Sequence, residues 1–210
     1  ASILSSVGQL RYQIDGNNVQ TEARLEVSSL GAQFDTFRVR LPEGSEYIRY
    51  EDRTTDANGT LGRMIKSVER EPQGEEGDEG RVYVVKLNAE TKGPVVLQLT
   101  TNHQLEREGE KGRTRLHGFE VLGAVRQDGK IGLGVDSQLQ LSFAAENLQQ
   151  VDLSEFVAAA TTTSPGDELT VALRYFSLPW ALDLEVAKRE RRVSATSEYD
   201  IKIDKDEIRL

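Results

Sequence analysis

Apolar and polar side chains alternate along most of the chain with a period of two residues. Leu10, Tyr12 and Ile14 share one face of the first such segment. Similar segments follow at 23–27, 37–41, 119–125, 131–135, 139–143, 169–175, 182–186 and 199–203, and the strongest of the first half are 82–87 and 95–99. Because successive side chains of a β-strand point to opposite faces, this period predicts sheets with one dry and one wet side.

Turn sequences separate these segments every 8–12 residues. Asp15-Gly16-Asn17-Asn18 and Gln127-Asp128-Gly129-Lys130 are typical of hairpins, since Asp-Gly and Asn-rich steps accept positive φ at low cost. The spacing predicts an all-β fold, an antiparallel β-sandwich with little or no helix. One short helix over 153–160, capped by Ser154, competes with a simple loop in that stretch.

Two charged stretches interrupt the pattern, at 71–80 and 106–115. The second is the predicted domain boundary. It leaves an N-terminal β-sandwich lobe, 1–105, and a C-terminal lobe, 113–210, each close to the size of an immunoglobulin domain. We expect the two lobes to pack together. A single continuous sandwich with two long loops is the alternative.

The charge balance argues against two classes of partner. The chain has 35 acidic and 26 basic residues, for a net charge of −9. A nucleic-acid ligand requires a basic stripe, and an anionic membrane surface would repel this protein. No apolar run approaches the roughly 18 residues that a membrane-spanning helix needs. There is no Cys, which by itself does not fix the compartment.

The two ends of the chain resemble each other. Residues 10–19 can be laid over residues 199–208, with Asp15 on Asp204. This suggests one unit of a tandem array, although any two alternating hairpins look alike over ten residues. The chain opens Ala1-Ser2-Ile3-Leu4 without a Met or a signal-peptide pattern, so we expect a segment of a longer protein.

Two groups of residues could bind a metal ion, or could simply be solvated surface residues. His103 and His117 flank the charged stretch and could share a metal with carboxylates such as Glu106, Glu108 or Glu120, but their spacing matches no known ligand pattern. Surface histidines are the preferred interpretation. Weak Ca²⁺ binding is a second hypothesis, because hard oxygen ligands gather in turns. Its candidate ligands are Asp15, Asn17, Asp204 and Asp206, with 75–79 as a further acidic stretch. No other cofactor is expected.

Catalytic motifs are missing from the sequence. There is no Gly-x-Ser-x-Gly and no Cys nucleophile. Gly129, Gly132 and Gly134 lie close together but between strands, so a phosphate-binding loop is rejected. Paired carboxylates could hydrolyse glycosides, but among so many acidic residues some pair always has a suitable separation.

Aromatic residues offer little for sugar stacking, since they make up 6% of the chain. Trp180, the only tryptophan, continues the parity of 182–186 and is expected in the core. Tyr47 and Tyr50 could be exposed.

These observations predict a non-catalytic structural, adhesive or interaction module of a larger bacterial secreted or cell-surface protein, extracellular or periplasmic. Its expected partners are a protein or glycan at a cell surface and neighbouring modules of the same chain, with no nucleic acid and no membrane insertion. A carbohydrate-binding β-sandwich and a carboxylate-dependent hydrolase are the two alternatives.

Overall fold

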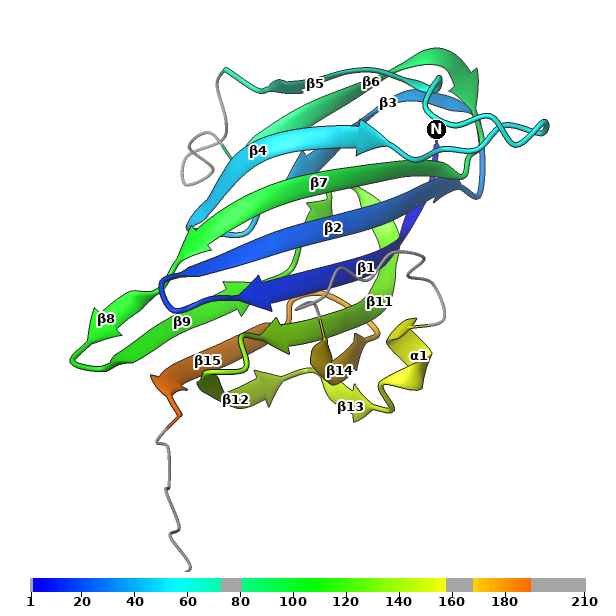
Figure 1. Cartoon of the computed structure of the whole chain (residues 1–210). Coiled ribbons are helices and arrows are strands. Elements are labelled where there is room, and N and C mark those ends of the chain that lie inside the picture. Colours follow the sequence, from blue (N-terminus) through cyan, green and yellow to red (C-terminus); the bar gives the residue numbers. More distant parts are fainter. Residues whose placement is uncertain (1, 73–80, 158–167, 190–210) are drawn as a thin grey trace, which may run out of the picture.

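The computed structural model describes residues 2–72, 81–157 and 168–189. In these ranges the chain forms three sheets and one helical turn (Figure 1), so the all-β prediction is confirmed. The largest sheet has seven strands in the order β13 (Gln149–Val151), β14 (Leu169–Tyr175), β11 (Ala124–Val135), β1 (Leu4–Ile14), β2 (Asn18–Ser29), β7 (Val95–Gln104) and β4 (Ser45–Asp52).

Two four-stranded sheets accompany the large one. The first has the order β10 (Glu120–Val121), β3 (Phe34–Arg40), β6 (Val82–Thr91) and β5 (Ile65–Arg70). The second has the order β12 (Leu139–Glu146), β15 (Ala181–Lys188), β9 (Lys111–His117) and β8 (Glu106–Glu108). In Figure 1, β5 and β6 lie at the top of the molecule, and β12 and β15 lie at the bottom.

The first predicted hairpin is present, but the prediction of a second hairpin is wrong. β1 and β2 meet at the turn 15–18, where the Asp15 amide donates to the Asn18 carbonyl at 3.0 Å. Residues 127–130 instead lie inside the continuous strand β11, which pairs in parallel with β1. This is the one parallel pair among the strands described, and the prediction of a purely antiparallel sheet did not include it.

Close packing, not turning, explains the glycine at 129. Gly8 of β1 lies opposite Gly129 of β11, and the ring of Tyr175 lies against both. A Cβ atom on Gly8 would lie 2.0 Å from the Tyr175 hydroxyl, and one on Gly129 would lie 2.1 Å from the Gly8 carbonyl oxygen. Only glycine fits at a backbone position that another group approaches so closely.

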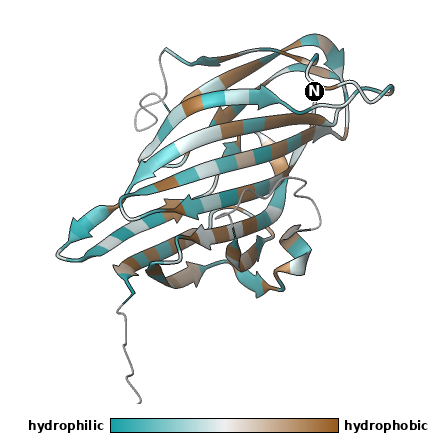
Figure 2. Ribbon diagram, viewed as in Figure 1, coloured by the Kyte–Doolittle hydropathy of each residue, from teal (hydrophilic) through white to brown (hydrophobic). Residues whose placement is uncertain are grey.

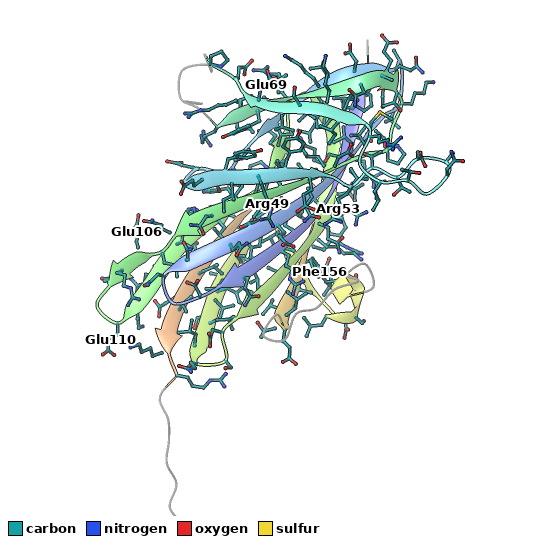
Figure 3. All side chains as sticks on the ribbon, turned by 45° about the horizontal axis from the view of Figure 1, so that its top comes forward. Arg49, Arg53, Glu69, Glu106, Glu110 and Phe156 are labelled. Atoms are coloured by element: carbon teal, nitrogen blue, oxygen red, sulfur yellow. The ribbon has the colours of Figure 1, made fainter. Side chains whose placement is uncertain are left out.

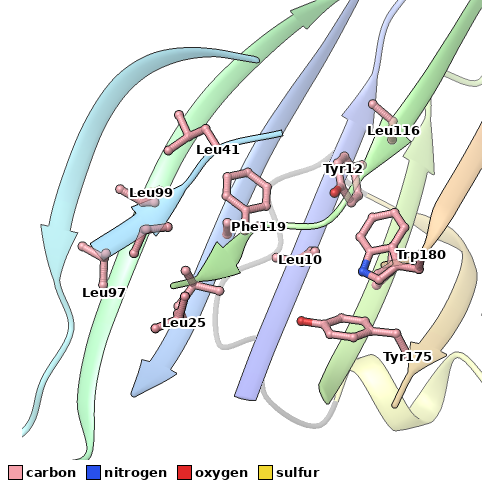
Figure 4. Packing of buried hydrophobic residues seen from close by; sticks show 14 of the residues in the cluster. Leu10, Tyr12, Leu25, Leu41, Leu97, Leu99, Leu116, Phe119, Tyr175 and Trp180 are labelled. Atoms are coloured by element: carbon pink, nitrogen blue, oxygen red, sulfur yellow. The ribbon is translucent and has the colours of Figure 1, made fainter. Parts of the chain in front are cut away.

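Most of the buried apolar residues form one connected core. Brown, hydrophobic positions alternate with teal ones along β2 in Figure 2, as the period-two pattern requires. Tyr12 of β1 packs in the same cluster as Tyr175 and Trp180 from the last third of the chain (Figure 4). Trp180 is 1% exposed, which confirms its expected place in the core.

The large sheet extends across the predicted lobe boundary. It combines β1, β2, β4 and β7, which precede residue 105, with β11, β13 and β14, which follow residue 113. The boundary itself lies in the hairpin of β8 and β9. The division into lobes 1–105 and 113–210 stays a prediction, and these pairings favour the continuous-sandwich alternative.

The one helix in the described part of the chain, α1 (Ser154–Val157), packs on the outward face of the large sheet. Its cap is Asp152 and not Ser154: the Asp152 Oδ1 accepts a hydrogen bond from the Ser154 amide at 2.8 Å. Hydrogen bonds from the Ser154 side chain and amide lower the pKa of the Asp152 carboxyl. Phe156, 2% exposed, lies over Gly132 of β11, where a Cβ atom would meet its ring at 2.8 Å. Figure 3 shows α1 and Phe156 beside the sheet.

Candidate functional site

A groove of about 1220 Å³ lies where the large sheet meets the sheet of β9, β12 and β15. We call it the groove. The turn between β3 and β4 borders it, together with the end of β7 and the start of β8. Its lining residues are Glu43, Gly44, Glu46, Asn102, His103, Gln104, Leu105, Glu106, Arg113, Thr114, Arg115, His117, Ser142, Phe143, Ala144, Asp183, Leu184 and Glu185.

His103 connects two of these elements. It lies at the end of β7, and its Nε2 forms a short hydrogen bond with the Thr114 hydroxyl of β9. The imidazole is half-buried, and this burial lowers its pKa, whereas the nearby Gly44 backbone and the Glu106 carboxylate act in the opposite direction. Gly44 has a φ of 78°, and a Cβ atom there would lie 2.5 Å from the His103 ring. Glycine is therefore needed at this turn for both conformation and space.

The two histidines do not form a common metal site. His117 lies three residues beyond Thr114 on β9, which is about 10 Å along a strand and on its opposite face. In the part of the chain that the structure describes, no three His, Cys, Asp or Glu side chains are close enough to hold a metal ion. His103 lies at a strand end, as expected, but it is half-buried and contacts Thr114.

Ion pairs run across the strands that border the groove. Arg113 of β9 lies opposite Glu185 of β15, and Arg115 lies opposite Asp183. Their nitrogen–oxygen distances are 2.8 Å and 2.7 Å. Hydrogen bonds from Lys111 and Arg113 lower the pKa of the Glu185 carboxyl. The Glu185 carboxylate is therefore held ionised, which suits charge recognition better than proton donation.

Three other carboxylates of the groove are differently placed: Glu43 and Glu46 lie on the side of the β3–β4 turn and β4, and Glu106 lies opposite Arg113 in the β8–β9 pair. Glu43, Glu46 and Glu106 are all exposed, and among the residues described none of them forms an ion pair. Glu106 lies at the start of β8 in Figure 3. The groove therefore contains both paired charges and carboxylates that form no ion pair with the described residues.

A smaller pocket of about 280 Å³ adjoins the groove and shares Glu43 and His117 with it. We call it the indole pocket, because Trp180 forms part of its lining. The other residues around it are Arg40, Leu41, Pro42, Arg81, Gly118, Glu120, Leu178 and Pro179. Sequence reasoning placed Trp180 in the core correctly but did not find this pocket, since its members come from four distant parts of the chain.

The calcium candidates are only partly described. Asp15 Oδ1 accepts a hydrogen bond from the Asn17 amide, and the Arg107 guanidinium donates to Asn17 Oδ1 and, at 3.0 Å, to the Gly16 carbonyl. A cationic group thus already uses the oxygens of Asn17 and Gly16. Asp204 and Asp206 lie outside the described residues, as do the acidic stretch 75–79 and the second copy of the suggested repeat, 199–208.

The tyrosines considered for sugar stacking are half-buried. Tyr47 of β4 stacks on Tyr83 of β6, with ring centroids 4.7 Å apart. Tyr50 packs against the same core cluster. These rings join two sheets and do not form an exposed platform.

Fold and site together define a three-sheet β protein with an open polar groove and an adjoining small pocket. No family model matches the chain, and no curated protein matches it either. The crystal structure of an M1 zinc metallopeptidase from Deinococcus radiodurans is similar, with a TM-score of 0.46 and 13% sequence identity. The match covers 88% of this chain and 42% of that chain. So distant a likeness carries no argument about activity or metal binding here.

Proposed function

We propose that this chain is a non-catalytic interaction module of a larger bacterial secreted or cell-surface protein, and that it binds a partner protein in the groove. The groove carries the proposal, since it is large, open and lined by polar side chains from several strands. Side chains on packed strands keep their positions, so little order is lost on binding. A structural or adhesive role, with neighbouring modules of a tandem array as partners, belongs to the same proposal.

The chemistry of the groove supports binding more than catalysis. His103 and Thr114 resemble a base beside a hydroxyl nucleophile. The other ring nitrogen, however, faces the main chain of Gly44 and not an orienting carboxylate. Thr114 also lies within β9, whose main chain pairs with β15, and not on an exposed turn. A hydrolase based on this pair would lack the carboxylate that orients the base and the exposed turn that presents the nucleophile.

No helix in the described ranges is both long and apolar enough to cross a membrane. The secreted or cell-surface location is a separate part of the proposal, and it rests on the sequence alone. The full-length gene product tests it: a signal peptide and flanking copies of the module are expected, and a leaderless, single-copy protein would contradict it.

Selection from a displayed library of random dodecapeptides tests the binding function. We expect peptides that bind the chain and lose at least tenfold in affinity when Glu46→Lys and Glu106→Lys alter the groove. Glu26→Lys, on the outward face of β2, is the matched control and should leave affinity unchanged. Failure to select any peptide, or equal loss in the control, would refute the groove as the binding surface.

One observation favours the carbohydrate-binding alternative. Phe176 is 62% exposed beside a shallow hollow of about 470 Å³ that Asn147 and Gln149 also line. An aromatic face next to amide groups is suited to sugar rings. Binding on a glycan array that disappears with Phe176→Ala would establish this function, and an array without any binding would remove it.

A further inference from the structure

In the described part of the chain, the three sheets have six edges, and five of these edges are poorly suited to pairing with another strand. An edge strand presents unpaired main-chain groups, which proteins usually protect by shortness, β-bulges or charged side chains. β8, β10 and β13 have three residues or fewer. β4 and β5 are longer, but each has a register shift and carries charged side chains such as Arg49 and Lys66.

β12, the sixth edge, has none of these features. It has eight residues, and its pairing with β15 runs without a register shift. Its sequence, Leu-Gln-Leu-Ser-Phe-Ala-Ala-Glu, contains no Pro, Lys or Arg. The one charged residue is the last, Glu146, and it pairs with Arg115 of β9 at 2.9 Å. The rest of this edge is uncharged and unbulged, which is the kind of edge that accepts a further strand.

Hydrogen bonds at the start of β12 show which main-chain groups face away from β15. The Arg189 amide donates to the Gln138 carbonyl at 2.8 Å, whereas the next amide along, that of Leu139, donates to Asp136 in the preceding turn at 2.9 Å. In an antiparallel pair, residues that bond to the partner strand alternate with residues that do not. Every second residue of β12 therefore directs its N–H and C=O to the free edge, where no described main-chain group pairs with them. These residues are Leu141, Phe143 and Ala145.

The two faces of β12 differ in what they offer a neighbouring strand. Leu141 and Phe143 are half-buried and pack against the core cluster, so side chains beside them should be apolar. Ser142 and Ala144 are exposed and small, which leaves room for long side chains on the other face. An added strand with apolar residues at every second position would match this alternation.

The charge of the groove favours basic residues at the remaining positions. Ser142, Phe143 and Ala144 line the groove, so the free edge borders it. The groove lining contains five carboxylates and two arginines. Both arginines, Arg113 and Arg115, are already in ion pairs with β15. A segment beside β12 would therefore meet a net negative charge, which Lys or Arg side chains complement.

We propose that the partner in the groove adds an extended segment to the free edge of β12, as a fifth strand of this sheet, and that this segment alternates apolar and basic residues. The inference rests on the proposed function, because it states how the partner protein is held. Hydrogen bonds to the main chain of Leu141, Phe143 and Ala145 supply affinity, and the alternating side chains supply specificity.

Hydrogen exchange of the whole chain with a synthetic peptide tests the inference. The probe is the heptapeptide Lys-Val-Lys-Val-Lys-Val-Lys, acetylated at its N-terminus and amidated at its C-terminus. We expect it to slow exchange at the amides of Leu141, Phe143 and Ala145 in a saturable way. The amides of β13, an edge of the large sheet, should exchange at an unchanged rate. No saturable protection of β12, or equal protection of β13, would overturn the inference.

Two modified peptides test the main-chain and charge contributions separately. The same peptide with N-methyl groups on its three valines keeps every side chain and charge but loses the N–H groups that would face β12. It should bind at least about tenfold more weakly, the size of one or two lost hydrogen bonds. A peptide with Glu in place of each Lys should also bind more weakly. Equal affinity of the methylated peptide would refute strand pairing, and equal affinity of the Glu peptide would refute the basic partner.

A proline at the free edge tests the position from the side of the protein. Ala145 is exposed and its N–H faces away from β15, so Ala145→Pro removes no hydrogen bond of the sheet but blocks a further strand. This variant should bind the Lys-Val peptide at least about tenfold more weakly. Ala57→Pro is the matched control, because Ala57 is an exposed second residue of the turn 56–59, where proline is tolerated. Unchanged affinity in Ala145→Pro would contradict the inference, and the methylated peptide tests the wild-type chain even if this variant fails to fold.

The outcomes for the two proposals are distinguishable. Library peptides that depend on Glu46 and Glu106 but leave the amides of β12 unprotected would refute strand addition and leave the interaction function standing. Saturable protection of β12 by the Lys-Val peptide, without any selected library peptide, would refute the groove function and leave the pairing edge standing. Protection of β12 that rises with protein concentration in the absence of peptide would show that a second copy of the chain occupies the edge, and would overturn the inference.

Discussion

At the scale of single residues, glycines mark the places where other groups come closest. Gly129 and Gly132 of β11 face opposite sides of the sheet, and each lies against an aromatic ring, that of Tyr175 or that of Phe156. The sequence predicts a hairpin turn at 127–130, which includes Gly129 but not Gly132. Which rings lie over these glycines depends on residues 24 and 46 positions away, so local pattern alone could not show the reason.

We expect Gly129→Ala to destabilise the protein by about 2 kcal/mol or more, as overpacking of a filled core does. Its Cβ atom would lie 2.6 Å from the Tyr175 hydroxyl and closer still to the Gly8 backbone. Denaturant unfolding followed by circular dichroism measures the change. Gly16→Ala is the matched control: no atom lies within 4 Å of its Cβ, and a change within about 1 kcal/mol is expected. Equal effects at the two positions would contradict this packing.

His103 should make stability depend on pH. Burial lowers its pKa below the ordinary value of 6.5, so the unfolded chain takes up a proton before the folded chain does. The free energy of unfolding should therefore be highest above pH 6.5 and should fall as the pH decreases through 6.5 toward the lower folded pKa. Comparing unfolding at pH 7.5 and pH 5.5 in wild type and His103→Gln measures this contribution. In His103→Gln, the free energy of unfolding should fall less between pH 7.5 and pH 5.5 than in wild type. In His117→Gln, it should fall as much as in wild type. If the free energy of unfolding of His103→Gln falls as much as that of wild type, burial of this ring does not contribute to the pH dependence of stability.

At the scale of elements, the short helix α1 depends on one side chain. Four residues form too few hydrogen bonds for a stable isolated helix. Phe156 holds it on the sheet, and the Glu155 carboxylate lies 3.1 Å from Arg174. The sequence predicts either a short helix capped by Ser154 or a loop in this stretch. Asp152 takes that role because its side chain, two residues earlier, reaches the first free amide.

Phe156→Ala should therefore cost about 3 kcal/mol, the range for truncating a buried phenylalanine. Phe176→Ala is the matched control, since its ring is 62% exposed, and should change stability by less than about 0.5 kcal/mol. Thermal unfolding gives both values. Hydrogen exchange at the amides of α1 should also rise in the first variant and not in the second. If the two variants melt alike, the docking of α1 contributes nothing.

At the scale of the whole molecule, the alternation of apolar and polar residues predicts the all-β fold class correctly. It does not predict which strands pair. It marked strands such as 10–14 and 182–186 because one of their faces is dry. It could not show that β1 pairs with β11, since pairing partners more than a hundred residues apart leave no local trace. The groove and the indole pocket were missed for the same reason: Glu43, Arg81, His117 and Trp180 meet only in the folded chain.

The shared sheet makes a prediction about fragments. Separate chains of residues 1–105 and 113–210 should each show poor dispersion in ¹⁵N–¹H spectra, because the first leaves the edge of β1 unpaired and the second leaves β11 without β1. Mixing the two should recover dispersed signals. Two fragments that each fold cooperatively would instead establish the two lobes as independent domains.

The direction of β1 has a practical consequence for binding assays. This strand begins at Leu4 and ends at Ile14, so its 11 residues carry the chain about 35 Å from the start of the sheet to the turn beside β8. An affinity tag or surface linker fused ahead of Ala1 would therefore tether the protein by the end remote from the groove. Immobilised in this orientation, the chain would keep the groove facing the solution, where a dissolved partner can reach it.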